Sequence, residues 1–512
     1  PQVFDLVYRT LFHNVTMLHC RRVSVLVFLA VASATHHSDL QDETSFLQTY
    51  PRPLPQKGAL NSCTGAGVGM NLLRSPTADK YFWKNKNGDH ICTGSSKNVA
   101  PFNISGGPSW TLAAGTDEMF MSNPLIDDQE NIYLCPSWTA TCYKFNSRGE
   151  KLWTFTSSCN DGGGFHMTPA ILDGKLYIGQ YGCAIAVDME TGDLVWQTKV
   201  APMAAMVLSS TGAYSGVVLV TALSHHGDFD DRTLGDDLIA ALNSSSGEVL
   251  WTWKSPTRLY NLMFNFVENP PSVISSDSSG SPFRLQLCNG ELLWYAKPEP
   301  LSVFTTGADI VHEGLGLVFS TSNWGLDQGR LTAYHVGSGE RAWQRYFSLP
   351  AGAGPAIGNL GGGVPLSVVV ALGKPADPFP PGPDNGTYAY RGELRAVDAL
   401  TGKDTGWSWS PPTWHKQFAE GELGMSMTRE VMGYDPCGPD HWTNPAIDGN
   451  GTVFAGHLSG HLFAVHDLDG DGKINESTGE VSSWYAGRCF QAPVAISPSM
   501  LIGTSCGAMH VF

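Results

Sequence analysis

The feature that most constrains this chain is a short phrase that recurs along it: a polar turn, a Gly, a charged residue, two further residues and a Trp. Gly149-Glu-Lys-Leu-Trp153 is one copy, and Gly247-Glu-Val-Leu-Trp251 is another. The shortest spacing between successive Trp residues of this set is 43 residues, which is the length of one four-stranded propeller blade. The strands of the set contain Trp110, Trp153, Trp196, Trp251, Trp294, Trp343, Trp407 and Trp484.

A second phrase lies upstream of several of these turns and begins with a Pro. It reads Thr168-Pro-Ala-Ile and Asn444-Pro-Ala-Ile, and related copies start at Asn123, Gly354 and Ala492. A strand opened by Pro, a Gly/Asp turn and apolar alternation with a period of two are typical of hairpin-connected strands. The 57 Gly and 32 Pro also favour short strands and turns over helices. We therefore predict an all-β fold.

The ends of the repeat region indicate how the ring closes. The chain stops at Phe512, three strands into a blade that has no Trp strand of its own. The strand of Trp110 can supply that fourth strand, and closure of this kind removes exposed sheet edges. We predict an eight-bladed propeller over residues 106–512, closed by an amino-terminal strand.

These paired phrases resemble the PQQ-like, or quinoprotein-type, β-propeller repeat. The resemblance extends over about residues 106–512 and rests on several spaced copies of a pattern of many residues. It implies that the Trp of one blade docks against the next blade. The family includes both oxidoreductases and non-catalytic scaffolds, so the fold by itself does not assign a function.

The segment before the repeats divides into three parts. Residues 17–34 run from the first Met through Arg21-Arg22 and a 12-residue apolar stretch to Ala32-Ser33-Ala34, which is the pattern of a secretory signal peptide. The stretch is shorter than the roughly 20 residues that span a bilayer, so we expect no transmembrane segment, a signal anchor being the alternative. Residues 1–16 are then upstream translated sequence, and residues 35–105 are expected to form a cap or strap. We predict a secreted protein or one of the secretory-pathway lumen.

Charge and cysteine content fit that compartment. The formal net charge of −16 excludes nucleic acid as a partner, because nothing would neutralise phosphates. Removal of Cys20 with the signal leaves an even number of cysteines, and we expect disulfides between Cys135 and Cys142 and between Cys63 and Cys92. Glycosylation is predicted at five Asn-x-Ser/Thr sequons: Asn103, Asn243, Asn385, Asn450 and Asn475.

One turn in the seventh blade is lengthened and acidic. Alternating carboxylates followed by Gly allow a loop to surround a hard cation, and this loop is similar to an EF-hand calcium loop, except that Thr478 stands where a bidentate Glu is expected. We predict a structural Ca²⁺, with a solvated acidic turn as the alternative. The candidate ligands are Asp467, Asp469, Asp471, the carbonyl of Lys473, and Glu476 or Glu480.

Residues next to the strand-opening Pro residues are expected to gather at one mouth of the central channel. A concave funnel lined by polar and aromatic groups is the usual small-molecule site of such a ring, although hydrated channel lining is the alternative. The candidate funnel residues are Asn123, His166, Thr168, Glu268, Asn269, His441, Trp442, Asn444 and Gln491.

Two classes of function remain open on the sequence. Quinone-dependent dehydrogenases of the resembling family carry adjacent cysteines beside the cofactor, and this chain has no Cys-Cys pair and no Cys-x-x-Cys-His haem motif. We therefore favour a binding or scaffold module for a protein, glycan or small ligand. The alternative is a PQQ- or metal-dependent oxidoreductase with its site in the funnel and Glu268 or His166 as the base.

Overall fold

The computed structural model describes residues 80–512 with internal gaps. The chain divides into two units, Pro1–Arg52 and Pro53–Phe512, and every described residue belongs to the second unit. The predicted signal peptide and residues 1–16 therefore lie outside the described residues. The gaps within 80–512 are residues 116–117, 160–167, 181, 202–210, 223–235, 300–301, 304–308, 326, 377–387, 425–426 and 434–435.

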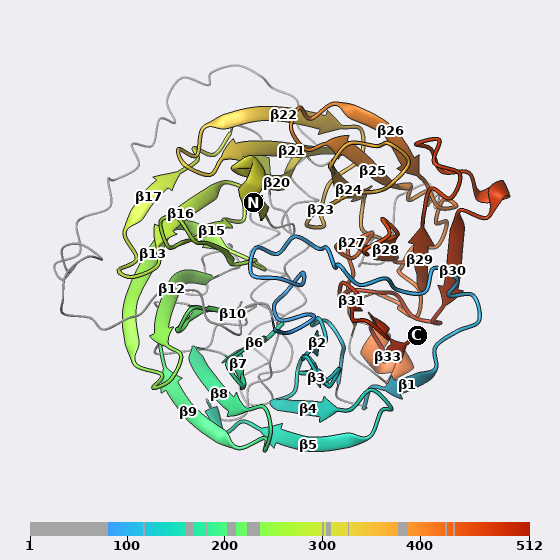
Figure 1. The fold of residues 1–512 in the computed structure, drawn as a ribbon. Coiled ribbons are helices and arrows are strands. Elements are labelled where there is room, and N and C mark those ends of the chain that lie inside the picture. Colours follow the sequence, from blue (N-terminus) through green and yellow to red (C-terminus); the bar gives the residue numbers. More distant parts are fainter. Residues whose placement is uncertain are drawn as a thin grey trace, which may run out of the picture. The chain divides into compact units, whose positions relative to one another are not determined.

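Eight antiparallel sheets form a ring in the second unit, which confirms the predicted eight-bladed propeller (Figure 1). In six of the sheets the strands follow one another in sequence order from the centre of the ring to its rim, and blades 5 and 8 are the exceptions described below. Blade 1 consists of β2 (Leu125–Ile126), β3 (Ile132–Leu134), β4 (Thr141–Phe145) and β5 (Lys151–Thr156). Blade 2 consists of β6 (Ala170–Leu172), β7 (Lys175–Gln180), β8 (Cys183–Asp188) and β9 (Leu194–Lys199). Blade 3 consists of β10 (Thr211–Tyr214), β11 (Val217–Ala222), β12 (Asp236–Asn243) and β13 (Val249–Leu259). Blades 4 and 5 consist of β14 (Asn265–Val267), β15 (Ser272–Ser276), β16 (Pro282–Gln286) and β17 (Leu292–Tyr295); and β18 (Ser302–Val303), β19 (Asp309–His312), β20 (Leu317–Trp324), β21 (Gln328–His335) and β22 (Arg341–Phe347). In blade 5 both β18 and β19 pair with β20. Blades 6 and 7 consist of β23 (Ala356–Gly358), β24 (Ser367–Gly373), β25 (Gly392–Asp398) and β26 (Asp404–Trp409); and β27 (Ala446–Ile447), β28 (Val453–Gly456), β29 (His461–Val465) and β30 (Val481–Tyr485).

Blade 8 is built from both ends of the repeat region. Three of its strands come from the end of the chain, and its outermost strand pairs Trp110 with Val511 and Ala113 with Ala508. The sheet therefore joins segments about 400 residues apart in sequence and leaves the ring without a gap at this blade (Figure 1). Its strands are β31 (Ala495–Ile496), β32 (Leu501–Ser505), β33 (Ala508–Val511) and β1 (Trp110–Ala113).

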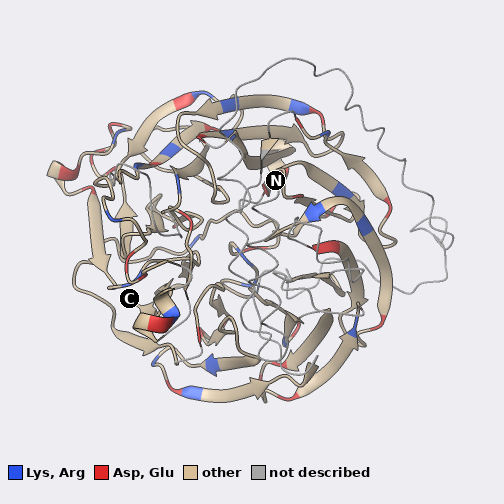
Figure 2. Ribbon diagram, turned by 180° about the vertical axis from the view of Figure 1, so that it is seen from behind, with Lys and Arg blue, Asp and Glu red and all other residues tan. Residues whose placement is uncertain are grey.

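Burial along the strands follows their distance from the rim. Every residue of β11 is buried, because an inner strand is covered by the neighbouring blade on each face. The rim strand β9 instead places Trp196 inward between exposed neighbours. Basic and acidic residues both occur along the outer strands around the ring (Figure 2).

In six of the blades the repeated Trp docks on the Gly turn of the following blade. The indole N–H of Trp251 donates to the carbonyl of Leu287 at 2.8 Å, and a Cβ on Gly290 would lie only 2.5 Å from the Trp251 ring. Gly290 also has a φ of +71°, a conformation that strains any residue with a side chain. The same donation links Trp110 to Ser147, Trp153 to Met189, Trp196 to Ser244, Trp294 to Val336 and Trp343 to Ala399.

Helical structure is confined to single turns in the described part of the chain. These are η3 (Glu313–Leu315), η4 (Thr428–Met432) and η5 (Glu476–Thr478). Among the described residues, no helix has the length and apolar character needed to cross a membrane.

Candidate functional site

Residues 83–96, called here the central segment, cross the middle of the ring (blue in Figure 1). The segment belongs to the region from which a cap or strap was expected, and its backbone carbonyls accept hydrogen bonds from the inner strands of six blades. These bonds satisfy strand-edge N–H groups that would otherwise face the axis. The donor and acceptor pairs are Ile126 and Trp83, Ile171 and Lys84, Phe266 and His90, Val311 and Ile91, Ile357 and Thr93, and Ile447 and Gly94, at 2.8–3.3 Å.

Three predicted funnel residues, Asn123, Thr168 and Asn444, join neighbouring blades. The side-chain amide of Asn123 donates to the carbonyl of Pro493 at 2.8 Å, and its backbone N–H donates to the Thr168 hydroxyl at 2.9 Å. The side-chain oxygen of Asn444 accepts the N–H of Gly354 at 2.8 Å. These polar groups are thus already used to position the inner strands.

Two acceptor oxygens of the predicted funnel residues make no such contact between blades. Asn123 Oδ1 and Gln491 Oε1 are buried and have no hydrogen-bond partner among the residues that the structure describes. A buried acceptor without a partner is costly, so a water or a ligand with donor groups would stabilise this position. His166, also predicted for the funnel, lies outside the described residues.

The prediction that Glu268 and Asn269 share this mouth is wrong. Both residues follow the inner strand β14, which ends at Val267, and so lie at its opposite end. There the hydroxyl of Tyr214 donates to Glu268 Oε1 at 2.7 Å, and Asn269 is exposed. The cause of the error is Pro270, which resembles the strand-opening Pro of other blades but lies in the hairpin after the strand. Glu268 is therefore not placed to act as a base in the predicted funnel.

His441 is part of a buried chain of hydrogen bonds that the sequence did not reveal. Its Nδ1 must donate to the carbonyl of Lys374 at 2.7 Å, so in the neutral ring its Nε2 accepts from His457 Nε2 at 3.0 Å. His457 Nδ1 then accepts the backbone N–H of Ser459 at 3.2 Å, and the Ser459 hydroxyl contacts His461 Nδ1 at 3.0 Å. His457, Ser459 and His461 lie in and beside the tight turn between β28 and β29, which brings their side chains together.

The space for His441 comes from two glycines on paired strand positions. A Cβ on Gly373 or on Gly392 would come within 2.3 Å of the His441 ring. The neighbouring Trp442, also a predicted funnel residue, donates its indole N–H to the carbonyl of Leu372 at 3.0 Å. His441 and Trp442 therefore pack over the end of blade 6 rather than facing an open channel.

Burial keeps these histidines neutral. Desolvation lowers the pKa of His441 to about 4, although the carbonyl of Lys374 opposes the shift. Desolvation also lowers the pKa of His457, and nearby His441 and His461 add to the effect. In the central segment, burial lowers the pKa of Lys86 to about 7. His441 and His457 thus form a buried, hydrogen-bonded neutral pair, whereas Lys86 lies apart from them and donates to Asn261.

The acidic loop of blade 7 brings together three of its predicted ligands. Carboxylate oxygens of Asp467, Asp469 and Glu480 lie within 4.8 Å of one another, and Asp467 and Glu480 are buried. Asp467 accepts the N–H groups of Gly470 and Gly472 at 2.9 and 2.8 Å, so the loop bends around its carboxylate. Carboxylates leave lone pairs free beyond such bonds, and this donor set fits a hard cation.

Two other predicted ligands of this loop, the side chains of Asp471 and Glu476, are not part of this cluster. Asp471 is exposed and accepts the backbone N–H of Lys473 at 2.8 Å. Glu476 accepts the indole N–H of Trp409 at 2.7 Å, which links blade 6 to blade 7. Of the two glutamates considered from the sequence, Glu480 is the one in the carboxylate cluster.

The structure contains the expected Cys135–Cys142 disulfide but not the expected bond of Cys92 with Cys63. Cys92 is a buried free thiol of the central segment, with its Sγ 3.6 Å from the carbonyl oxygen of Phe264. It packs in the hydrophobic core around blades 5 and 6. Cys63 lies outside the described residues. Further disulfides join Cys159 to Cys183 and Cys437 to Cys506, and Cys288 is also disulfide-bonded.

The glycosylation sequons remain predictions. Asn103, Asn450 and Asn475 are exposed and Asn243 is partly exposed, whereas Asn385 lies outside the described part of the chain.

The ring of eight blades, six of which dock a Trp on the Gly turn of the next blade, defines a PQQ-like β-propeller. A family model described as outer membrane protein assembly factor BamB matches residues 139–487, and the chain belongs to this family. BamB from Burkholderia pseudomallei is 25% identical over an alignment of 261 residues, and the match covers 44% of this chain and 68% of that protein.

Solved structures share the fold at low sequence identity. Quinohemoprotein alcohol dehydrogenase from Comamonas testosteroni is 14% identical, with a TM-score of 0.57 over 85% of this chain and 81% of that chain. BamB from Moraxella catarrhalis is also 14% identical, with a TM-score of 0.50 over 79% of this chain and 98% of that chain. Since both an enzyme and an assembly factor match, these structures support the fold alone.

Proposed function

We propose that this chain is a secreted or secretory-pathway binding module that acts as a scaffold for a protein partner. The observation that carries the proposal is the position of the central segment. Its carbonyls accept hydrogen bonds from the inner strands of six blades, so the polar groups that a small-molecule site in the funnel would need are already paired. The BamB family, whose name describes an assembly factor, supports a protein as the partner. A glycan or small-molecule ligand is the competing outcome of the test below.

The long connection between blades 6 and 7 offers the best binding surface. It carries the turn η4. Met427, just before this turn, and Val431 and Met432 within it are 44%, 60% and 42% exposed. We call these three residues the apolar loop. Large apolar side chains that remain exposed next to one another often mark a protein-interaction site. Met427 and Val431 are four positions apart and therefore lie on a similar side of a helical turn.

Site-specific photo-cross-linking tests this proposal. We expect a photoreactive residue at Val431 to give one adduct of discrete mass in the producing cells, and the same residue at Val99, which is 48% exposed elsewhere, to give none. Excess wild-type protein should suppress the adduct, and protein with Val431→Ser and Met432→Ser should not. A quinone chromophore and the corresponding mass in the purified protein would instead establish the oxidoreductase alternative.

We also propose that Asp467, Asp469 and Glu480 hold a structural Ca²⁺. The support is the convergence of their carboxylates, which would repel one another without a cation. Asp467 packs against the turn at Gly362, where an added Cβ would lie 2.3 Å from Asp467 Oδ2. A cation here would therefore stabilise the contact between the acidic loop and blade 6. Its removal is tested below by melting experiments.

A further inference from the structure

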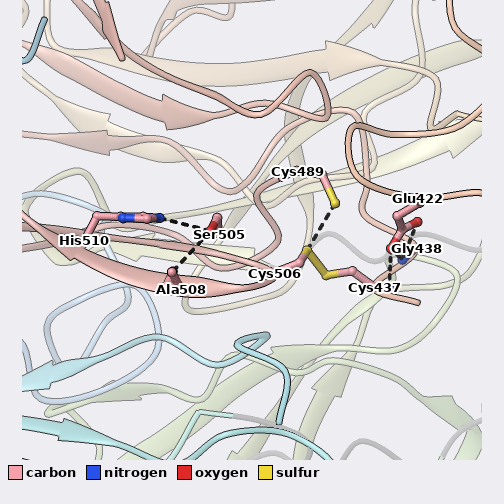
Figure 3. The surroundings of a disulfide bond; sticks show 8 residues. All are labelled: Glu422, Cys437, Gly438, Cys489, Ser505, Cys506, Ala508 and His510. Atoms are coloured by element: carbon pink, nitrogen blue, oxygen red, sulfur yellow. Dashed lines mark hydrogen bonds between the residues drawn. A yellow bond between two sulfur atoms is a disulfide. The ribbon is translucent and has the colours of Figure 1, made fainter. Parts of the chain in front are cut away.

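Three cysteines meet where the connection after blade 6 reaches blade 8 (Figure 3). Cys437 and Cys506 form a disulfide whose Cα atoms are 6.0 Å apart. The free thiol of Cys489 lies with its Sγ 3.2 Å from Cys506 Sγ, and all three side chains are buried. Cys506 is thus in contact with one bonded sulfur and one thiol sulfur.

The backbone places Cys489 and Cys506 opposite each other. The N–H of Cys506 donates to the carbonyl of Cys489 at 2.8 Å, and the adjacent residues Phe490 and Ser505 form an antiparallel bridge. Opposite residues of an antiparallel pair have Cα atoms about 4.5–5.5 Å apart, within the range of about 4.4–6.8 Å that a disulfide requires. Cys506 therefore has two partners with which a bond needs no movement of the fold.

We propose that these residues form a thiol–disulfide exchange site with Cys506 as the shared sulfur. Cys489 loses its proton to water and attacks Cys506, forming the Cys489–Cys506 bond. The Cys437–Cys506 bond breaks, and the departing Cys437 sulfur takes up a proton. One disulfide and one thiol are present before and after, so the step needs no oxidant or reductant.

The surroundings of the site hold the exchange at a slow rate. Burial raises the pKa of Cys489, and the negative charge of Glu422 raises it further, so the thiol stays protonated at neutral pH. Glu422 also accepts the backbone N–H groups of Cys437 and Gly438, which holds Cys437 beside Cys506 (Figure 3). Because the thiolate attacks, the exchange rate should rise about tenfold per pH unit.

Exchange changes what is anchored to the ring. The Cys437–Cys506 bond connects the segment after blade 6 covalently to the hairpin of blade 8, across 69 positions of sequence. The alternative Cys489–Cys506 bond closes only 17 positions within the last two blades. After exchange, the segment that contains Cys437 is held by non-covalent contacts alone, including those of Glu422.

Disulfide mapping of the full-length protein tests the proposal. The folded protein is held at pH 7, 8 and 9, quenched in acid, alkylated, digested and analysed by mass spectrometry. We expect alkylated Cys437 together with a Cys489–Cys506 peptide to accumulate about tenfold faster for each pH unit. Cys489→Ser is the matched control, because it keeps the resting disulfide and removes the attacking thiol. If wild-type protein yields the Cys437–Cys506 peptide alone at every pH, the proposal is wrong.

A second variant tests the geometry without relying on the rate. In Cys437→Ser, equilibrated in a glutathione redox buffer, we expect Cys489 and Cys506 to be recovered as one disulfide-linked peptide pair. Circular dichroism in the same buffer checks that the ring is folded. Recovery of both cysteines as free thiols or glutathione adducts from folded protein would overturn the inference that Cys489 is within bonding reach. Should this variant not fold, the wild-type time course above still decides.

Discussion

Replacing His441 by Asn should make the protein less sensitive to acid. The buried ring has a pKa of about 4, against about 6.5 for an exposed histidine of the unfolded chain. The unfolded state therefore binds the extra proton as the pH falls from about 6.5 to 4, and stability contributed by neutral His441 is lost over that window. This shift corresponds to a loss of about 2 kcal/mol at pH 5 and about 3 kcal/mol at pH 4. Asn retains an N–H for the carbonyl of Lys374 and has no group that titrates in this range.

The comparison must be between variants because other buried groups act in the opposite direction. Burial raises the pKa of Asp309 to about 7 and that of Asp236 to about 8, so both stabilise the folded protein as the pH falls. The wild-type stability curve is the sum of these trends. The difference between wild type and His441→Asn isolates the histidine, and the exposed His335→Asn is the control.

Urea unfolding at pH 7 and pH 5 provides the measurement. We expect wild type and His335→Asn to lose about 2 kcal/mol more than His441→Asn between the two pH values. Hydrogen exchange at the imidazole C2 position, followed by mass spectrometry, should give a midpoint near pH 4 for His441 itself. Equal losses for all three proteins, or a midpoint near 6.5, would refute the role assigned to the buried histidine chain.

Three further predictions concern stability. Chelation of calcium should lower the melting temperature of wild type and of Asp471→Asn but not of Asp469→Asn, because only Asp469 belongs to the carboxylate cluster. Calcium at about 100 times its dissociation constant adds roughly 2.7 kcal/mol to the free energy of unfolding. A wild-type melting curve that chelation leaves unchanged would contradict the site. Asn444→Ala should cost about 1–3 kcal/mol in urea unfolding because it leaves a buried N–H unpaired, and a loss below 0.5 kcal/mol would argue against its role between blades. In the same assay, Gly290→Ala should destabilise the protein more than Gly174→Ala. Both glycines have a positive φ, which costs an alanine about 1–2 kcal/mol, but only a Cβ at position 290 would also clash with a Trp ring. Equal effects of the two substitutions would contradict the docking contact.

The fold could be predicted because its information is local and repeated. Each copy of the phrase contains its own turn glycine, its own alternation with a period of two and its own Trp. A single copy, such as Gly290 to Trp294, therefore predicts one blade independently of the other copies. The acidic loop was found for the same reason, since Asp467 and Asp469 are close in sequence. Pro270 shows the limit of this approach, because one residue of a phrase without its context indicated a strand start that does not exist there.

The candidate sites were harder to predict because they depend on the ring. The inner strands leave backbone N–H groups at the axis, and the backbone of any extended segment can pair with them. Because side chains take no part in this pairing, the sequence of residues 83–96 does not predict it. Tertiary packing also sets the cysteine partners: Cys437 and Cys506 meet although 69 positions separate them.

The sequence by itself determined the blade, its repetition and the closing strand, since these follow from turn chemistry and alternation within about 43 residues. Only the tertiary structure decided that His441 contacts His457, that Glu480 rather than Glu476 joins the carboxylates, and that Cys489 lies beside a disulfide. The physical reason is that these contacts join loops from different strands and blades. Their distances are fixed by the packing of the ring, and a local pattern contains no information about that packing.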